Sequence, residues 1–445
     1  MKTFSFFLLR YFETSKAVVS ITKNEYKDAL VSMVANDSLA LSFFSSSAGF
    51  RKIAEPIAKK LNVSLDRDAV REMVVDRARQ LELDLISAMK KKPVFLKIDG
   101  ATRLGSSYLA INVQYVQNGK AIIKTLAVVD CAGKHSAAAT MELVKKVMER
   151  YELKKDQILA IVTDNARAML KTVELLNQAE VQESDEHENI NVTPEEDADE
   201  NADDYDDDLR ALAVDTSEVS TSSVPDTTIY TVRCAAHTLQ LAIRDGLKQH
   251  GASTVLAQAR SVAKKLRAPN MLSSLKNKGQ LLPMIDVETR WGSSFLMLKR
   301  LLALKVVVQD YAAASHELHM PERTWQQVQK LADILEQPYA VTVRLQSADL
   351  TAGTFFKEWC RLRELLEKEG AIGAAIAASM KQREERMLES DVLLAAIYAD
   401  TRYRILLGAR LEKAAKAFVN ITERVRLVHD TAPAADSPAT SVSSE

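Results

Sequence analysis

The chain has 445 residues, of which 47% are hydrophobic and 27% are charged, and this length is enough for two or three hydrophobic cores. Its three cysteines are too few for a disulfide framework, which indicates a reducing compartment. No run of about 18 uncharged apolar residues occurs, so we expect no membrane-spanning helix. The apolar residues 1–12 are interrupted by Arg10 and no clear cleavage site follows, so we do not expect a signal peptide.

Charge is distributed unevenly along the chain. The formal net charge is −1, but residues 180–208 hold 15 acidic side chains and no Lys or Arg, so the remainder carries +14. Such a basic remainder suits a polyanionic partner, and a solvated surface of mixed charge is the alternative. We expect residues 180–226 to form a disordered acidic insertion, because a block of like charge with few apolar residues cannot build a core. The Ser-, Pro- and Ala-rich tail, 431–445, is also expected to be disordered.

Residues 1–90 predict a helical region. The clearest helix is expected from about Asp66 to Met89, where apolar residues recur at steps of three and four. Pro93 ends this pattern, because proline cannot continue a helix.

A group of strands follows. Four apolar segments, separated by an Asn118-Gly119 turn and a helical segment, predict three antiparallel strands, a crossover helix and a fourth strand parallel to the first. The expected strands are Val94–Ile98, Leu109–Tyr115, Ala121–Val129 and Ile158–Thr163, and the expected helix is Ala137–Tyr151.

Two of these strands end in an aspartate. Asp99 follows the first strand and Asp164 follows the fourth, so parallel pairing would bring both carboxylates to one edge of the sheet. Mg²⁺ is usually held by one or two carboxylates together with substrate phosphates, which makes this pair a candidate metal site. The alternative is two aspartates that cap strand-to-turn junctions.

The rest of the chain predicts mainly helices. A short strand before Cys234 is followed by helical segments that continue to about residue 428. We therefore expect four parts: a helical region at 1–90, an α/β core at 91–300 that contains the insertion 180–226, a helical domain at 301–430, and the tail 431–445.

Four short blocks occur in a fixed order. They are Leu96–Gly100, Ile161–Ala166, Arg233–Leu241 and Thr289–Ser293. Taken together, in this order and spacing, they make the chain resemble the catalytic region of hAT-superfamily transposases.

This resemblance implies an α/β fold with an RNase H-like mixed sheet, interrupted by a mainly helical insertion and preceded by a helical region. It implies that Asp99 and Asp164 are catalytic acids that bind Mg²⁺ or Mn²⁺ during DNA strand cleavage and transfer. The Cys-x-x-His pair, Cys234 and His237, is then expected to support the DNA-facing end of the site. The alternative is a buried Cys and a hydrogen-bonded His at the start of a helix. DNA is the implied partner, the nucleus the implied location, and a homo-oligomer is a further expectation.

Two side chains of the fourth block are expected at the DNA end. Arg290 suits a phosphate and Trp291 suits stacking on an unpaired base. The alternative for Trp291 is packing at the start of a helix. Zinc is not expected at Cys234 and His237, because a structural zinc site needs four ligands and no second pair is visible.

Three features of the family are missing from this sequence. No Cys/His-rich zinc finger precedes residue 90, the C-terminal dimerisation segment is absent, and Thr422–Val425 only partly matches the family's Ser-Glu-Arg-x-Phe-Ser block, which carries its third acid. We therefore expect a truncated or domesticated relative. Three readings stay open: a metal-dependent DNA-processing enzyme, a non-catalytic nuclear protein that binds DNA or protein, and a non-functional product of a decayed element.

Overall fold

The computed structural model describes residues 20–103, 105–131, 136–178, 228–249, 251–287, 290–312 and 318–430. The segments predicted to be disordered, 180–226 and 431–445, lie outside these residues. The chain divides into two compact units, Met1–Ala88 and Met89–Glu445, which are described separately.

The described part of the first unit, residues 20–88, is mainly helical, as predicted. It contains α2 (Lys23–Ala35), α3 (Phe43–Ser46), α4 (Ala48–Leu61) and most of α5 (Arg67–Met89). These helices share a small core that includes Tyr26, Leu30, Phe44 and Ala54.

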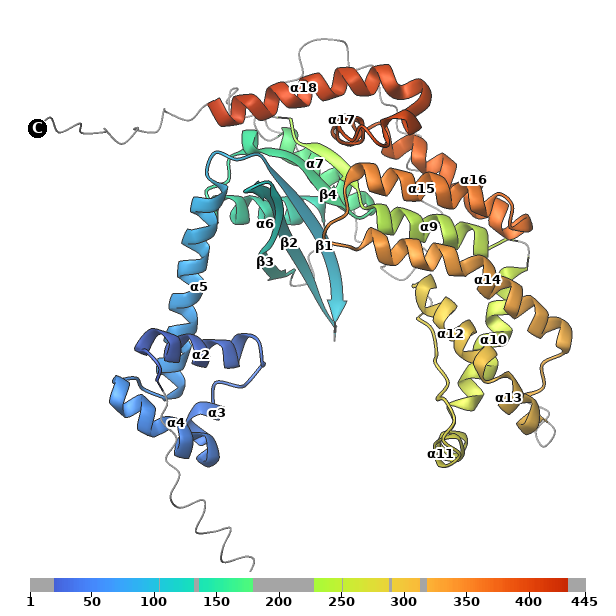
Figure 1. The fold of residues 1–445 in the computed structure, drawn as a ribbon, viewed down its shortest axis with the longest axis horizontal. Coiled ribbons are helices and arrows are strands. Elements are labelled where there is room, and N and C mark those ends of the chain that lie inside the picture. Colours follow the sequence, from blue (N-terminus) through green and yellow to red (C-terminus); the bar gives the residue numbers. More distant parts are fainter. Residues whose placement is uncertain are drawn as a thin grey trace, which may run out of the picture. The chain divides into compact units, whose positions relative to one another are not determined.

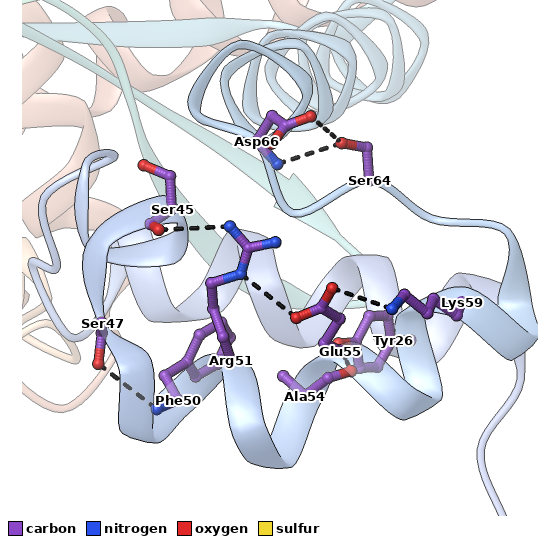
Figure 2. Close-up of polar contacts among 10 residues, drawn as sticks. All are labelled: Tyr26, Ser45, Ser47, Phe50, Arg51, Ala54, Glu55, Lys59, Ser64 and Asp66. Carbon is purple, nitrogen blue, oxygen red and sulfur yellow. Dashed lines mark hydrogen bonds and ion pairs between the residues drawn. The ribbon is translucent and has the colours of Figure 1, made fainter.

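Polar contacts define the ends and the face of α4 (Figure 2). The Ser47 hydroxyl accepts a hydrogen bond from the Phe50 amide at 3.4 Å, which caps the first turn. Glu55 pairs with Arg51 at 3.5 Å and with Lys59 at 3.2 Å, one helical turn away on either side. On the buried side, the Tyr26 hydroxyl donates to a backbone carbonyl of α4 at 2.9 Å. The first three contacts stabilise α4 itself, and the Tyr26 bond joins α4 to α2.

The second unit begins with a five-stranded mixed sheet (Figure 1). The strand order is β3-β2-β1-β4-β5, with β1–β2 and β2–β3 antiparallel and β1–β4 and β4–β5 parallel. The predicted meander and parallel fourth strand are thus confirmed. The bounds are β1 (Val94–Arg103), β2 (Ser106–Gln117), β3 (Lys120–Asp130), β4 (Ile158–Thr163) and β5 (Tyr230–Arg233).

Strand β1 is longer than the apolar pattern predicts. It continues past Asp99 to Arg103, because residues 99–103 pair with residues 106–110 in a tight hairpin. Gly105 has a φ of 81°, a conformation that glycine adopts without strain. Asp99 therefore lies within the strand rather than at its end.

Two helices cover the buried side of this sheet. They are α6 (Ala137–Arg150), the predicted crossover, and α7 (Arg167–Gln178), and both pack on the sheet and on each other. Val94, Leu96 and Ile98 alternate toward the buried face, while Lys97 and Asp99 are exposed. The acid thus reaches solvent from a strand that is otherwise anchored in the core.

The remaining helices share one large core. This core begins at Leu239 and reaches Ala417, with Trp325, Phe356 and Trp359 among its largest buried side chains. The predicted domain boundary at residue 300 runs through it. The helices are α9 (Ala235–Leu247), α10 (Ala252–Leu266), α11 (Pro269–Asn277), α12 (Trp291–Ala303), α13 (Lys305–Ala312), α14 (Glu322–Leu345), α15 (Ala352–Leu366), α16 (Gly370–Met387), α17 (Asp391–Ala399) and α18 (Leu411–Asp430).

Short 3₁₀ helices precede β4, at Lys155–Gln157, and α18, at Arg404–Arg410. Within the described part of the chain, every helix is too short or too polar to cross a membrane.

Candidate active site

Asp99 lies on β1, and Asp164 directly follows the neighbouring parallel strand β4. In the β1–β4 register Lys97 pairs with Val162, and each aspartate lies two residues farther along its own strand. Continuing that register sets Asp99 opposite Asp164, which directly follows β4. This pairing agrees with the prediction that the two acids lie side by side, but β1 continues past Asp99 to Arg103, so only Asp164 lies where its strand ends.

The electrostatics of Asp164 reflect its surroundings. Burial raises the pKa of Asp164, the Ala166 amide donates to Oδ1 at 3.1 Å and lowers it, and the nearby charges of His237 and Asp99 act in opposite directions. The net result is a raised pKa. A second negative charge beside a half-buried carboxylate is unfavourable, and a bound cation would relieve it.

The donor set suits a hard divalent cation. Two neighbouring carboxylates, one of them exposed, offer the oxygen ligands that Mg²⁺ and Mn²⁺ prefer in proteins, and water or substrate oxygens would have to complete the coordination. Among the described residues, no group of three or more His, Cys, Asp or Glu side chains could hold a metal ion. A closed structural site, which needs four protein ligands, is therefore not formed by the described residues around this pair.

The start of α9 is bonded to the Asp164 loop. The Cys234 amide donates to the Thr163 carbonyl at 2.7 Å, directly before Asp164. The side-chain nitrogen of Asn165 (Nδ2) donates to the Thr238 hydroxyl at 3.1 Å. The Arg233 guanidinium donates to the side-chain oxygen of Asn165 (Oδ1) at 3.2 Å. Sequence reasoning did not single out Asn165 or Thr238, although each directly follows a residue that it did identify.

Cys234 and His237 both lie at this junction. Cys234 is the N-cap residue of α9 and is half-buried, with its backbone bonded as described above. His237, also half-buried, interacts electrostatically with Asp164. The structure thus brings Asp99, Asp164, Cys234 and His237 together, while their contact with DNA stays a prediction.

Arg290 and Trp291 lie at the start of α12. Arg290 is exposed, and its backbone carbonyl accepts a hydrogen bond from the Ser293 hydroxyl at 2.6 Å. Trp291 is only 3% exposed and meets Tyr339 of α14 edge to face, with ring centroids 6.3 Å apart. Among the described residues, no hydrogen bond, ion pair or ring contact joins either side chain to Asp99 or Asp164. The indole has the packing role that was the alternative, and base stacking stays a prediction.

A buried ion pair fixes the segment before Trp291. Asp286 accepts two hydrogen bonds from Arg260 of α10, at 2.8 and 2.7 Å, and one from the Ser294 hydroxyl at 2.6 Å. Burial alone would raise the pKa of Asp286, but these bonds and the Arg260 charge lower it overall. The sequence gives no separate signal for this pair, because its partners are 26 residues apart.

The partial match to the family's third-acid block lies at the other end of the sheet. Arg424 is 6% exposed and donates to the carbonyls of Ile158 (2.9 Å) and Thr228, at the starts of β4 and β5. Its neighbour Glu423 is exposed and pairs with Arg426 at 2.6 Å. In the described chain, this glutamate therefore serves a surface ion pair on α18.

Comparison with known proteins agrees with this architecture. Residues 232–334 match the family model of the ZBED1 RNase-like helical domain. The putative AC transposase of Zea mays is 25% identical over 213 residues, which are 43% of this chain and 26% of that protein. The putative transcriptional regulator tpeD of Talaromyces stipitatus is 31% identical over 105 residues, 23% of this chain and 12% of that protein.

The sheet order, the paired acids and the RNase-like helical match define an α/β protein with an RNase H-like core and a helical insertion, as predicted. Over the matched segments the chain is similar to transposases of the hAT type. The matched segments span about a quarter or less of the two relatives' own lengths.

Proposed function

We propose that this chain is a transposase-derived protein that acts on DNA in the nucleus and binds Mg²⁺ or Mn²⁺ at Asp99 and Asp164. The single observation that carries the proposal is the β1–β4 register, which, continued two residues past the Lys97–Val162 pair, sets the two acids side by side. The likeness to a maize transposase supports DNA as the substrate class.

The two carboxylates differ in what they can contribute. Asp99 is exposed and can reach a cation or the water around a phosphate, whereas Asp164 is half-buried and held by the Ala166 amide. A divalent ion bound there would supply Lewis-acid activation of a water or a 3′-hydroxyl and stabilisation of the leaving oxygen. His237 adds a polar group beside Asp164 that can meet a DNA phosphate.

Binding to DNA has a separate physical basis. Outside residues 180–208 the chain carries +14, which favours a polyanion through release of counterions. Exposed Arg290 is suited to a phosphate contact, so its loss should weaken binding and reduce the salt dependence. We include the predicted role of Cys234 in this proposal as a support of the DNA end.

The enzymatic form of the proposal is tested with flanked-end and hairpin DNA in the presence of Mg²⁺ or Mn²⁺. Cleavage that is lost in Asp99→Asn and Asp164→Asn supports it. Asp310→Asn, an exposed aspartate of α13, is the matched control and should cleave like the wild type. Cleavage that survives either active-site change would refute the assignment of these acids.

A second candidate is a non-catalytic nuclear protein that binds DNA or another protein. The surface ion pair between Glu423 and Arg426 favours it, because the residue that partly matches the third acid is engaged elsewhere. Salt-sensitive DNA binding without cleavage in the same assay would support this candidate over the enzyme.

A further inference from the structure

Asn165 directly follows Asp164 in the sequence, and the residue is only 7% exposed. Both ends of its amide are bonded: the nitrogen donates to the Thr238 hydroxyl at 3.1 Å, and the oxygen accepts from Arg233 at 3.2 Å. A buried amide bonded at both ends has one orientation, because turning it over would lose both hydrogen bonds.

The partner of Asn165 is itself fixed. Thr238 is 2% exposed, and its hydroxyl donates to the Cys234 carbonyl at 2.9 Å within the first turn of α9. The Cys234 amide in turn donates to the Thr163 carbonyl at 2.7 Å. The loop that carries Asp164 is therefore tied to α9 on both sides of the acid, through residue 163 and through residue 165.

Helix α9 belongs to the large helical core through Leu239, Ala242 and Ile243. A displacement of α9 would thus be transmitted to Asp164 through Asn165. Metal ligands need support from neighbouring hydrogen bonds, since a misplaced carboxylate binds its ion weakly.

We propose that Asn165, through its hydrogen bond to Thr238, is a positioning residue for divalent-cation binding at Asp164. This inference rests on the proposed function and adds to it: the helical insertion, by way of α9, sets the geometry of the acid pair. The role requires the amide donor of Asn165 and the hydroxyl acceptor of Thr238.

A second asparagine provides a matched comparison. Asn177 of α7 makes two bonds with the Ile229 backbone, both at 2.9 Å, just before β5. Asn177 thus joins the segments on either side of residues 179–227. Asn165 has a similar bridging role, because it joins β5 and α9 to the loop after β4. Asn177, however, lies at the opposite end of β5 from Asp164. Its loss tests whether any bridging amide has the same effect.

The test is Mn²⁺ binding to the full chain, measured by electron paramagnetic resonance together with the Tm of each variant. Asn165→Ala and Thr238→Val are expected to weaken Mn²⁺ binding by about 10-fold or more, the usual effect of losing such support. Thr238→Ser keeps the hydroxyl and should bind like the wild type. Asn177→Ala should lower the Tm and leave Mn²⁺ affinity unchanged.

Three results would overturn the inference. Wild-type affinity in both Asn165→Ala and Thr238→Val would show that the hydrogen bond has no role in metal binding. Equal weakening in Asn177→Ala would reduce that role to general stability. A wild-type chain that binds no Mn²⁺, or one whose Mn²⁺ affinity is unchanged in Asp99→Asn and Asp164→Asn, would refute the metal site itself and with it the proposed function. If Asn165→Ala does not fold, the Thr238→Val and Thr238→Ser pair decides the question.

Discussion

Replacing Arg260 with methionine isolates the energetic role of the buried ion pair beside Trp291. The carboxylate of Asp286 is 0% exposed and accepts two bonds from Arg260 and one from Ser294. Without Arg260 the buried carboxylate keeps the Ser294 hydroxyl but loses both bonds to the guanidinium. Loss of one partner from such a pair costs about 3–5 kcal/mol of unfolding free energy.

The sign of the pH dependence follows from the lowered pKa of Asp286. A folded-state pKa below the unfolded value of about 3.9 means that the stabilisation is complete above that value and is lost as the pH falls through the folded pKa. In Arg260→Met the carboxylate loses its partner and its pKa rises. The difference in stability between wild type and variant should therefore be large at pH 7 and shrink below about pH 4.

Urea unfolding at pH 7 and below about pH 4 measures the difference in unfolding free energy between wild type and Arg260→Met. The double variant Arg260→Met and Asp286→Leu is the control. The double variant should be more stable than Arg260→Met alone, because it removes the unpaired charge. A loss below about 1 kcal/mol at pH 7 in Arg260→Met, or a double variant less stable than the single one, would refute the argument.

Three further predictions concern the fold. Arg424→Ala should lower the unfolding free energy by about 3 kcal/mol, because two buried carbonyls lose a charged donor, while exposed Arg426→Ala should leave it unchanged in the same urea titration. Gly246→Ala should cost about 1–3 kcal/mol, since the added methyl group would collide with Ile376, and unaltered thermal unfolding would contradict that contact. Tyr26→Phe should reduce the protection of α4 amides by about 1 kcal/mol in hydrogen exchange, and unchanged protection would rule out its hydroxyl bond.

The sheet is the part of the fold that local sequence patterns predict best. Alternating apolar residues and the Asn118-Gly119 turn determine the meander, and both turn residues have positive φ, 52° and 72°. The crossover helix then requires β4 to lie parallel to β1. Adjacency of Asp99 and Asp164 follows from that topology, which is why two acids 65 residues apart could be paired from the sequence.

Other features depend on contacts that no local pattern encodes. The Asn165–Thr238 bond joins residues 73 positions apart, across the acidic insertion. The sequence does not mark where the α/β core ends and the helical domain begins. Helices α9 to α18 share one core, so the apolar periodicity continues through the boundary predicted at residue 300. A tryptophan side chain at the first position of a helix can pack into the core or extend into solvent. For Trp291 the contact with Tyr339 of α14, which is distant in sequence, shows that it packs.

The central claim is that residues 99 and 164 bind one divalent ion together. Fe²⁺ with ascorbate and peroxide cleaves a protein backbone near a bound metal ion, and Fe²⁺ takes the same oxygen ligands as Mn²⁺. The account predicts cleavage near both residues, suppressed by excess Mg²⁺ and abolished at both positions by Asp99→Asn. Cleavage near only one of them, or cleavage near residue 164 that survives Asp99→Asn, would contradict a shared site.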